Sequence, residues 1–261
     1  MLVPLYAAPH VTRAFWPVVM RNLLVWKKLA VPSVLGNIAE PLITLVAFGY
    51  GVGSLIGQIE GLPYIEYLAS GSVAASAALA ATFEALYSAY SRMAVQKTWD
   101  SILNAPVALD DIVFAEMLWA AMKALFSCAA IMIVIFLLGI SRAPTMLLAI
   151  PVLGLVGVTF ASVALVFNAV AKGYDFFTYY FTLVITPMTF LSGVYFPIAQ
   201  MPPWLQAVAN VLPLKAAVDL VRPLVLGNLP ADPGLPLLIL TGYACSGYYL
   251  ALVLTRRRFF R

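Results

Sequence analysis

The amino-acid sequence predicts an all-α protein that crosses a membrane several times. Three observations lead to this fold class. Only 10% of the 261 residues are charged, and 63% are hydrophobic. Soluble domains carry about 25% charged residues, so this chain has too few to cover a surface that faces water. Several apolar runs also approach or exceed the roughly 20 residues that cross a bilayer.

Six apolar segments predict six transmembrane helices within a single domain that covers residues 1–261. A helix satisfies its own backbone hydrogen bonds, which a bilayer demands because lipid offers no partners. The segments do not alternate between apolar and polar residues, as the strands of a membrane barrel would. The predicted spans are residues 38–57, 67–91, 112–140, 145–171, 176–196 and 235–254.

The basic residues divide unequally between the two sides that six spans would create, and Lys123 falls within a span. One side would carry only Arg142, Lys215 and Arg222. The positive-inside rule places the more basic side, with both termini, in the cytoplasm of a bacterial inner membrane. The net charge of +4 therefore indicates topology and no nucleic-acid partner. The cytoplasmic bases would be Arg13, Arg21, Lys27, Lys28, Arg92, Lys97, Lys172, Arg256, Arg257, Arg258 and Arg261.

The segment before the first span, residues 9–30, predicts an interfacial amphipathic helix. Its bases fall within an arc of about 120° on a helical wheel, opposite apolar residues. A helix of this kind lies on the cytoplasmic leaflet. A poorly ordered tail is the alternative, disfavoured because tryptophan and leucine are costly to expose. The basic end of the chain, residues 255–261, predicts a stop signal at the level of the lipid head groups.

A charged, helix-forming interruption separates the second span from the third. Trp99, Ile102 and Leu103 follow i, i+3, i+4 spacing, which gives one apolar patch on a short helix. Pro106 ends that helix, so the sequence predicts a cytoplasmic helix over 96–105 that presents the patch outward. The alternative is that Trp99 anchors the helix at the head groups, and the pattern alone leaves both interpretations open.

The second and fifth predicted spans carry distinctive small residues. The second is rich in glycine, alanine and serine, which predicts close packing between helices. The fifth carries a weakly polar stripe that is broken at Pro187. Such stripes usually pack against other helices, and the lining of a transport path is the alternative. The stripe consists of Thr178, Thr182, Thr186, Thr189 and Gly193.

Residues 197–226 are too polar and too rich in proline to cross a membrane. Their apolar positions predict two short amphipathic helices, separated at Pro213, that dip into the outer face as a re-entrant hairpin. The first face consists of Trp204, Leu205, Val208 and Leu212. The second consists of Leu214, Val218, Val221 and Val225.

No catalytic, cofactor or metal motif is present in the sequence. It has no G-x-x-x-x-G-K-[ST] loop to hold a nucleotide phosphate, and H-E-x-x-H and G-x-S-x-G are also absent. Cys128 and Cys245 have no metal-ligand spacing, which predicts that both are small buried residues. An enzyme is therefore disfavoured.

Three ionisable residues lie within the predicted spans. Glu116 and Lys123 lie about two helical turns apart, hence on one face. Lys123 is then placed to pair with Glu84 on the adjacent span. Structural pairing is favoured over a role in substrate binding.

The whole chain resembles the permeases of type-2 ATP-binding-cassette exporters. The match covers the basic amphipathic start, the six spans, a coupling helix between spans two and three, and the hairpin before the last span. The segment "FLSGVYFPIAQMPPWLQAVANVLPLKAAVDLVRPLVLG" (190–227) is similar to the most recognisable part of that family. Residues 67–125 resemble the nodulation-type lipooligosaccharide permeases.

The resemblance implies a homodimer of this chain, carrying two copies of a cytosolic ATPase that binds ATP and magnesium. Its substrate would be an amphipathic lipid-linked saccharide, moved outward among the membrane lipids. Alternatives are a multidrug exporter permease and an ion-coupled secondary transporter, although no internal repeat supports the latter. ATPase coupling would fall to Trp99, Asp100, Ile102 and Leu103. The substrate path would be lined by Thr44, Phe48, Thr178, Thr182, Thr186 and Thr189.

Overall fold

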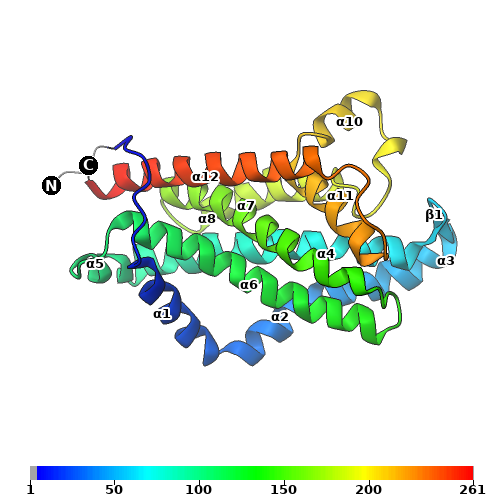
Figure 1. The fold of residues 1–261 in the computed structure, drawn as a ribbon, viewed down its shortest axis with the longest axis horizontal. Coiled ribbons are helices and arrows are strands. Elements are labelled where there is room, and N and C mark those ends of the chain that lie inside the picture. Colours follow the sequence, from blue (N-terminus) through cyan, green and yellow to red (C-terminus); the bar gives the residue numbers. More distant parts are fainter. Residues whose placement is uncertain (1–4, 261) are drawn as a thin grey trace.

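The computed structural model describes residues 5–260 and shows an almost entirely helical bundle. The strands of the described chain form one antiparallel pair, β1 (Gln58–Ile59) with β2 (Leu62–Pro63). Figure 1 shows the start of the described chain and the last turn of the final helix, α12, at one end of the bundle, which we call the terminal end. The opposite end, with β1, is the distal end. The side chains outside the description are those of residues 34, 37, 38, 40 and 41.

Within the described residues, four helices are long and apolar enough to cross a membrane. They confirm four of the six predicted spans as helices of sufficient length. Two of them combine an α-helix with tighter or wider turns. The four are Tyr64–Val95 (α4 Tyr64–Phe83 with the π-helical turns η2 Glu84–Ser88 and η3 Ser91–Val95), α6 (Leu109–Leu137), Pro144–Val170 (η4 Pro144–Leu148 and α7 Ala149–Val170) and α12 (Gly234–Phe260).

The first apolar segment is helical from well before its predicted start. Helix α1 (Phe15–Lys27) covers the inner part of the predicted helix over 9–30, and residues 9–14 before it are not helical. A short turn then leads into α2 (Ala30–Val46), the π-helical turn η1 (Ala47–Val52) and α3 (Gly53–Ile56). The apolar part of this helix, Leu42–Ile56, is shorter than a typical span.

The fifth apolar segment ends before its predicted limit of residue 196. It consists of α8 (Asp175–Tyr180), the π-helical turn η5 (Phe181–Ile185) and α9 (Thr186–Phe190). The chain then turns at Gly193, whose φ of +79° lies in the region that favours glycine. A helix of this length is short for a bilayer crossing, which takes about 20 residues.

Two short helices follow this turn, as predicted, and their apolar faces differ in burial. After the 3₁₀ turn η6 (Ile198–Gln200) come α10 (Pro203–Ala209) and α11 (Pro213–Val225). The predicted apolar face of α11 is buried throughout. On α10, Trp204 is 67% exposed, so its predicted face is open at the surface.

Small residues let the long helices approach closely, which confirms the packing predicted for the second span. Helix α4 lies in the centre, against α6, α7 and α11, and nearly all of its residues are buried. A Cβ on Gly157 of α7 would lie 2.9 Å from the Ala121 Cα of α6. A Cβ on Gly247 of α12 would lie 2.9 Å from Ser162 Oγ of α7. Only glycine fits at these crossings without a shift of the helices.

Candidate functional site

A buried ion network joins the long helix Tyr64–Val95 to α6 near the terminal end. Lys123 Nζ lies 2.6 Å from Glu84 Oε2, which confirms the predicted pair. Arg92 joins both acids: its Nη2 lies 2.9 Å from Glu84 Oε1 and 2.5 Å from Glu116 Oε2. The sequence interpretation counted Arg92 only as a basic residue of the cytoplasmic side, so it missed the residue that links the network.

Two tryptophan indoles complete the coordination of the carboxylates. Trp119 Nε1 donates to Glu84 Oε1 over 2.9 Å, and Trp99 Nε1 donates to Glu116 Oε1 over 3.2 Å. Both glutamates are 3% exposed or less. Every carboxylate oxygen of the pair thus accepts at least one hydrogen bond, and buried charges are tolerated when they are paired and bonded in this way.

The predicted outward orientation of Trp99, Ile102 and Leu103 is wrong. They lie on α5 (Thr98–Leu103), where Trp99 is 1% exposed and its ring stacks on Phe259 with centroids 6.0 Å apart. Ile102 and Leu103 are half-buried against the core. The physical reason is that the buried Glu116 carboxylate needs a donor, and an indole supplies one from an apolar body. Neither an exposed patch nor an anchor at the head groups describes Trp99.

The exposed face of α5 is polar. Asp100, the fourth residue predicted for coupling, is exposed, and so are Ser101 and Asn104 beyond it. Spacing of i, i+3, i+4 identifies one face of a helix, but it does not say whether that face points inward or outward.

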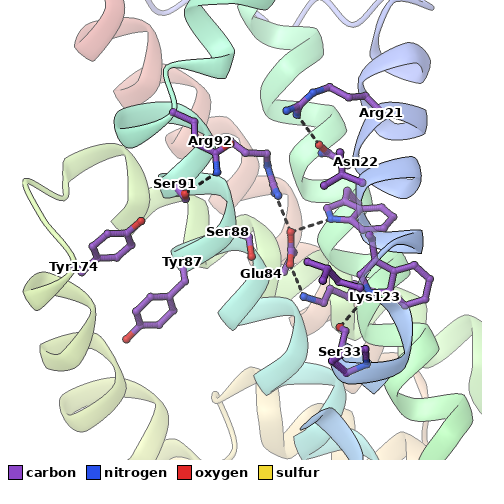
Figure 2. Close-up of a pocket in the computed structure, with 16 residues that line it drawn as sticks. Arg21, Asn22, Ser33, Glu84, Tyr87, Ser88, Ser91, Arg92, Lys123 and Tyr174 are labelled. Atoms are coloured by element: carbon purple, nitrogen blue, oxygen red, sulfur yellow. Dashed lines mark hydrogen bonds and ion pairs between the residues drawn. The ribbon is translucent and has the colours of Figure 1, made fainter. Parts of the chain in front are cut away.

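A cavity of about 670 Å³ opens beside the ion network. Figure 2 shows Arg21 and Asn22 reaching in from α1, Glu84 and Arg92 from the helix Tyr64–Val95, and Tyr174 from the chain before α8. Its walls therefore come from segments that are distant in sequence and meet near the terminal end.

Arg21 and Asn22 lie together on the cavity wall. Arg21 Nη1 donates to Asn22 Oδ1 over 3.1 Å, and Asn22 is 3% exposed. The other amide atom, Asn22 Nδ2, is buried and has no hydrogen-bond partner among the described residues. Burial and the nearby Arg92 lower the pKa of the Arg21 guanidinium, and Glu116 opposes them in part. This corner of the cavity is electropositive and has donors to spare, which suits an oxygen-rich ligand.

The residues predicted to line a substrate path are mostly at the surface of the single chain. Thr178, Thr182 and Thr186 are exposed along α8–α9. Thr189 is partly buried and donates its hydroxyl to the Ile185 carbonyl over 2.8 Å. The stripe is therefore not packed against another helix of this chain at its first three positions.

The first segment meets the turn that follows the fifth segment through an aromatic contact. Phe48 is 45% exposed, and its ring centroid lies 6.0 Å from that of Tyr195. Phe190 approaches the same tyrosine at 5.5 Å. Thr44, one turn before Phe48, is partly buried. Each of the two segments predicted to line a path thus contributes one ring to the aromatic cluster around Tyr195.

Arg222 lies at the distal end with its guanidinium largely buried, where the sequence predicted only a base on the outer side of the membrane. Its Nη2 donates to the Gly193 carbonyl over 2.6 Å, and its guanidinium lies 3.8 Å from the Tyr67 ring centroid. The Tyr67 hydroxyl donates to the same Gly193 carbonyl over 2.9 Å. These contacts tie α11 and the turn after α9 to the start of α4.

The basic end of the chain is more than a stop signal at the head groups, because Arg256 is fully buried. Its guanidinium pairs with Asp110 over 2.5 Å and donates to the Ala7 carbonyl over 2.7 Å. Arg258 donates to the Ala171 carbonyl over 2.8 Å, at the end of α7. Cys128 is buried as predicted, but Cys245 is exposed, so the prediction for Cys245 is wrong.

Comparison with known proteins places this geometry in a family. Residues 13–226 match the family described as ABC-2 type transporter. The chain is 43% identical over 258 residues to Nodulation protein J of Bradyrhizobium diazoefficiens, which covers 98% of each chain. It is 44% identical over 238 residues to Nodulation protein J of Rhizobium meliloti, with 91% of each chain covered.

A more distant relative is named by its activity. The Inner membrane transport permease YadH of Escherichia coli is 23% identical over 194 residues, 74% of each chain. The family match includes α1, the ion network and the cavity, and it ends at the close of α11. The chain is therefore a membrane permease that belongs to the ABC-2 type transporter family.

Proposed function

We propose that this chain is the transmembrane subunit of an exporter that moves an amphipathic lipid-linked saccharide outward from the cytoplasmic side. ATP hydrolysis resides in a separate cytosolic subunit, because the sequence has no phosphate-binding loop of its own. Family membership and the similarity to Nodulation protein J support this proposal. Two copies of the permease and two of the ATPase form the working assembly, and no chemical step falls to this chain.

The terminal end faces the cytoplasm in this proposal. It holds α5 and the ends of α1 and α12, where the bases concentrate, and the positive-inside rule assigns such an end to the cytoplasm. All six apolar segments then cross the membrane, and the first and fifth lie at the interface between the two copies of the dimer. Helices α10 and α11 form the outer hairpin. The protein lies in a bacterial inner membrane with both termini inside.

The observation that carries the proposal is the link from α5 to the ion network. The exposed side of α5, with Asp100, Ser101 and Asn104, is free to dock on an ATPase. The buried side holds Trp99, which bonds Glu116 and through it Arg92. Closure of the ATPase would therefore displace α5 and, with it, the two long helices that α5 connects.

Transport by reconstituted vesicles tests the proposal. The permease is co-expressed with candidate ATPases, purified as a complex and placed in vesicles with a fluorescent lipid-linked oligosaccharide. We expect ATP-dependent movement of the label across the bilayer, and none with the permease alone or with an ATPase that cannot hydrolyse ATP. Movement that is independent of the ATPase but follows a proton or sodium gradient would instead favour a secondary transporter.

Cysteine labelling tests the orientation independently of transport. Cys245 is exposed and is first replaced by serine, whereas Cys128 is buried. A cysteine at Lys97 should react with an impermeant reagent only from the inside, and one at Gln200 only from the outside. Reaction of a cysteine at position 97 from the outside would contradict the proposed orientation of the chain in the membrane.

A further inference from the structure

The cavity beside the ion network contains one cation that the network does not neutralise. Arg92 and Lys123 are balanced by Glu84 and Glu116, with which they form ion pairs. Arg21 forms no ion pair with any acidic side chain that the structure describes, and it donates a hydrogen bond to the neutral amide of Asn22. The cavity therefore carries an excess positive charge on the wall that α1 supplies.

The unused donor of Asn22 points to a ligand in the same place. Asn22 Nδ2 is buried and donates to no atom in the described part of the chain. A buried N–H without an acceptor is unfavourable and uncommon in folded proteins. Here it belongs to the residue that Arg21 contacts, so a guanidinium and an amide donor occur together without an anion between them. An oxyanion would satisfy both through charge-assisted hydrogen bonds.

The remaining walls suit a sugar-sized group. A volume of about 670 Å³ lies within the range of roughly 300–1,000 Å³ that small-molecule sites occupy. The rings of Tyr87 and Tyr174 stand almost parallel, 9° apart, on the wall that faces Arg21 in Figure 2. Ser88 and Ser91 add hydroxyls on the helix that carries Tyr87. Flat aromatic faces and hydroxyls are groups that contact sugar rings.

We propose that this cavity receives the polar head group of the exported molecule, and that the head group carries a phosphate or sulfate held by Arg21 and Asn22. The inference rests on the proposed function for the direction of transport, but binding to the cavity does not require an ATPase. It narrows the substrate class from an amphipathic saccharide to an anionic one.

Binding of dodecyl phosphate to the full chain in phosphatidylcholine nanodiscs tests the assignment. Trp26 and Trp119 line the cavity, so tryptophan fluorescence reports occupancy, and Trp26→Phe should reduce the signal. Dodecyl maltoside, which has the same tail and a neutral head, and inorganic phosphate serve as the comparison probes. We expect tight binding only where a tail and an anion occur together. Equal half-saturation by inorganic phosphate would overturn the head-group assignment.

Variants of Arg21 separate the cavity from general surface charge. Arg21→Gln should raise the half-saturation concentration of dodecyl phosphate about tenfold, as expected for the loss of a charge-assisted hydrogen bond. Arg21→Lys should raise it less. Lys27→Gln is the matched control, because Lys27 is an exposed cation on the same helix that does not line the cavity. If Lys27→Gln raised the half-saturation concentration as much as Arg21→Gln, the effect would be general surface attraction and the proposal would be wrong.

Asn22→Asp provides a test that does not depend on a weakened fold. The substitution keeps the shape of the side chain and places a carboxylate beside Arg21, which neutralises the free cation. We expect the thermal unfolding temperature to be kept or raised while dodecyl phosphate binding falls at least tenfold. A stable Asn22→Asp variant with unchanged binding would refute the site. Binding without ATP-dependent transport would instead contradict the proposed function and leave the site standing.

Discussion

The indole N–H of Trp99 donates a hydrogen bond to Oε1 of Glu116 over 3.2 Å, and this bond joins α5 to the buried ions of α6. The same oxygen accepts a bond from Arg92 Nε over 2.9 Å, and Arg92 reaches Glu84. A residue of the helix between two spans is thus bonded to a network that both spans share. Under the proposed function, force on α5 reaches both helices through polar contacts as well as through the chain itself.

Trp99→Phe should uncouple this link while it keeps the aromatic stack on Phe259. The variant loses one hydrogen bond to a buried carboxylate, which costs about 1.5–3 kcal/mol of unfolding free energy. Trp99→Asp should be far more destabilising, because it places a second carboxylate beside Glu116. Thermal unfolding of the purified permease measures both effects. If Trp99→Asp unfolded at the same temperature as the wild type, that result would contradict the inward position of Trp99.

Asp100→Lys should weaken ATPase docking without a change in fold, since Asp100 is exposed on the outer side of α5. Asp232→Lys is the matched control, with the same charge change at an exposed position between α11 and α12. We expect co-purification of the ATPase to fall in Asp100→Lys alone, while both variants unfold at the wild-type temperature, because exposed charges contribute little to stability. Full recovery of the ATPase with Asp100→Lys would remove that side of α5 from the docking surface.

A double-mutant cycle on Glu84 and Lys123 should show strong coupling. Glu84→Gln leaves Lys123 without its acid and removes one partner of Arg92, so we expect a loss of about 3–5 kcal/mol, typical of a broken buried pair. The double variant Glu84→Gln with Lys123→Met should recover part of that loss, because the Lys123 ammonium is then no longer left without an acid, and Arg92 keeps Glu116 as its partner. The unfolding free energies of Glu84→Gln, Lys123→Met and the double variant together give the coupling free energy. Additive losses would mean that the pair is screened by water in the cavity.

The sequence predicted this pair but not its connections, and the difference is physical. Glu116 and Lys123 lie on one face of α6 because helix geometry fixes their spacing, and apolar run length alone identified the helix. Arg92 lies at the end of a span, where its long side chain is free to reach water or to turn inward. Its direction depends on Glu116, which belongs to another helix.

The burial of Arg256 depends on a still more distant contact. Its partner Asp110 is 146 positions away in the sequence, and the carbonyl of Ala7 completes the site from the other end of the chain. Composition near residue 256 shows only a basic cluster, which is typical of a membrane boundary. Long-range ion pairs of this kind follow from the tertiary structure and have no local signal.

Gly71→Ala should disturb the contact between α4 and the turn after α9. A Cβ at Gly71 would lie 2.8 Å from Arg222 Nη2 and 3.1 Å from Val194 Cα, so the arginine must move away from the Gly193 carbonyl. We expect a loss of about 1–3 kcal/mol, typical of overpacking. Unfolding free energy measures the loss.

Gly242→Ala is the control for this substitution, because a Cβ there meets no atom within 4 Å. It should leave stability unchanged or raise it by up to about 1 kcal/mol, since alanine is the better helix former. Arg222→Lys combined with Gly71→Ala should lose less than the sum of the two single variants, because both break the same contacts. Independent losses would show that Gly71 is constrained by Val194 alone.

Thr186→Trp distinguishes a transport path from a packed surface, because Thr186 is exposed on the single chain. Overpacking within one chain would cost about 1–3 kcal/mol, and an exposed position should escape that cost. If the threonine stripe lines a path enclosed by two copies, the bulky indole should stop export while the dimer and its ATPase still assemble. Leu238→Trp, at a position of α12 that is 71% exposed, controls for the size of the new side chain. Export is measured in vesicles and assembly by size-exclusion chromatography. A dimer of Thr186→Trp that transports at the wild-type rate would place the path elsewhere.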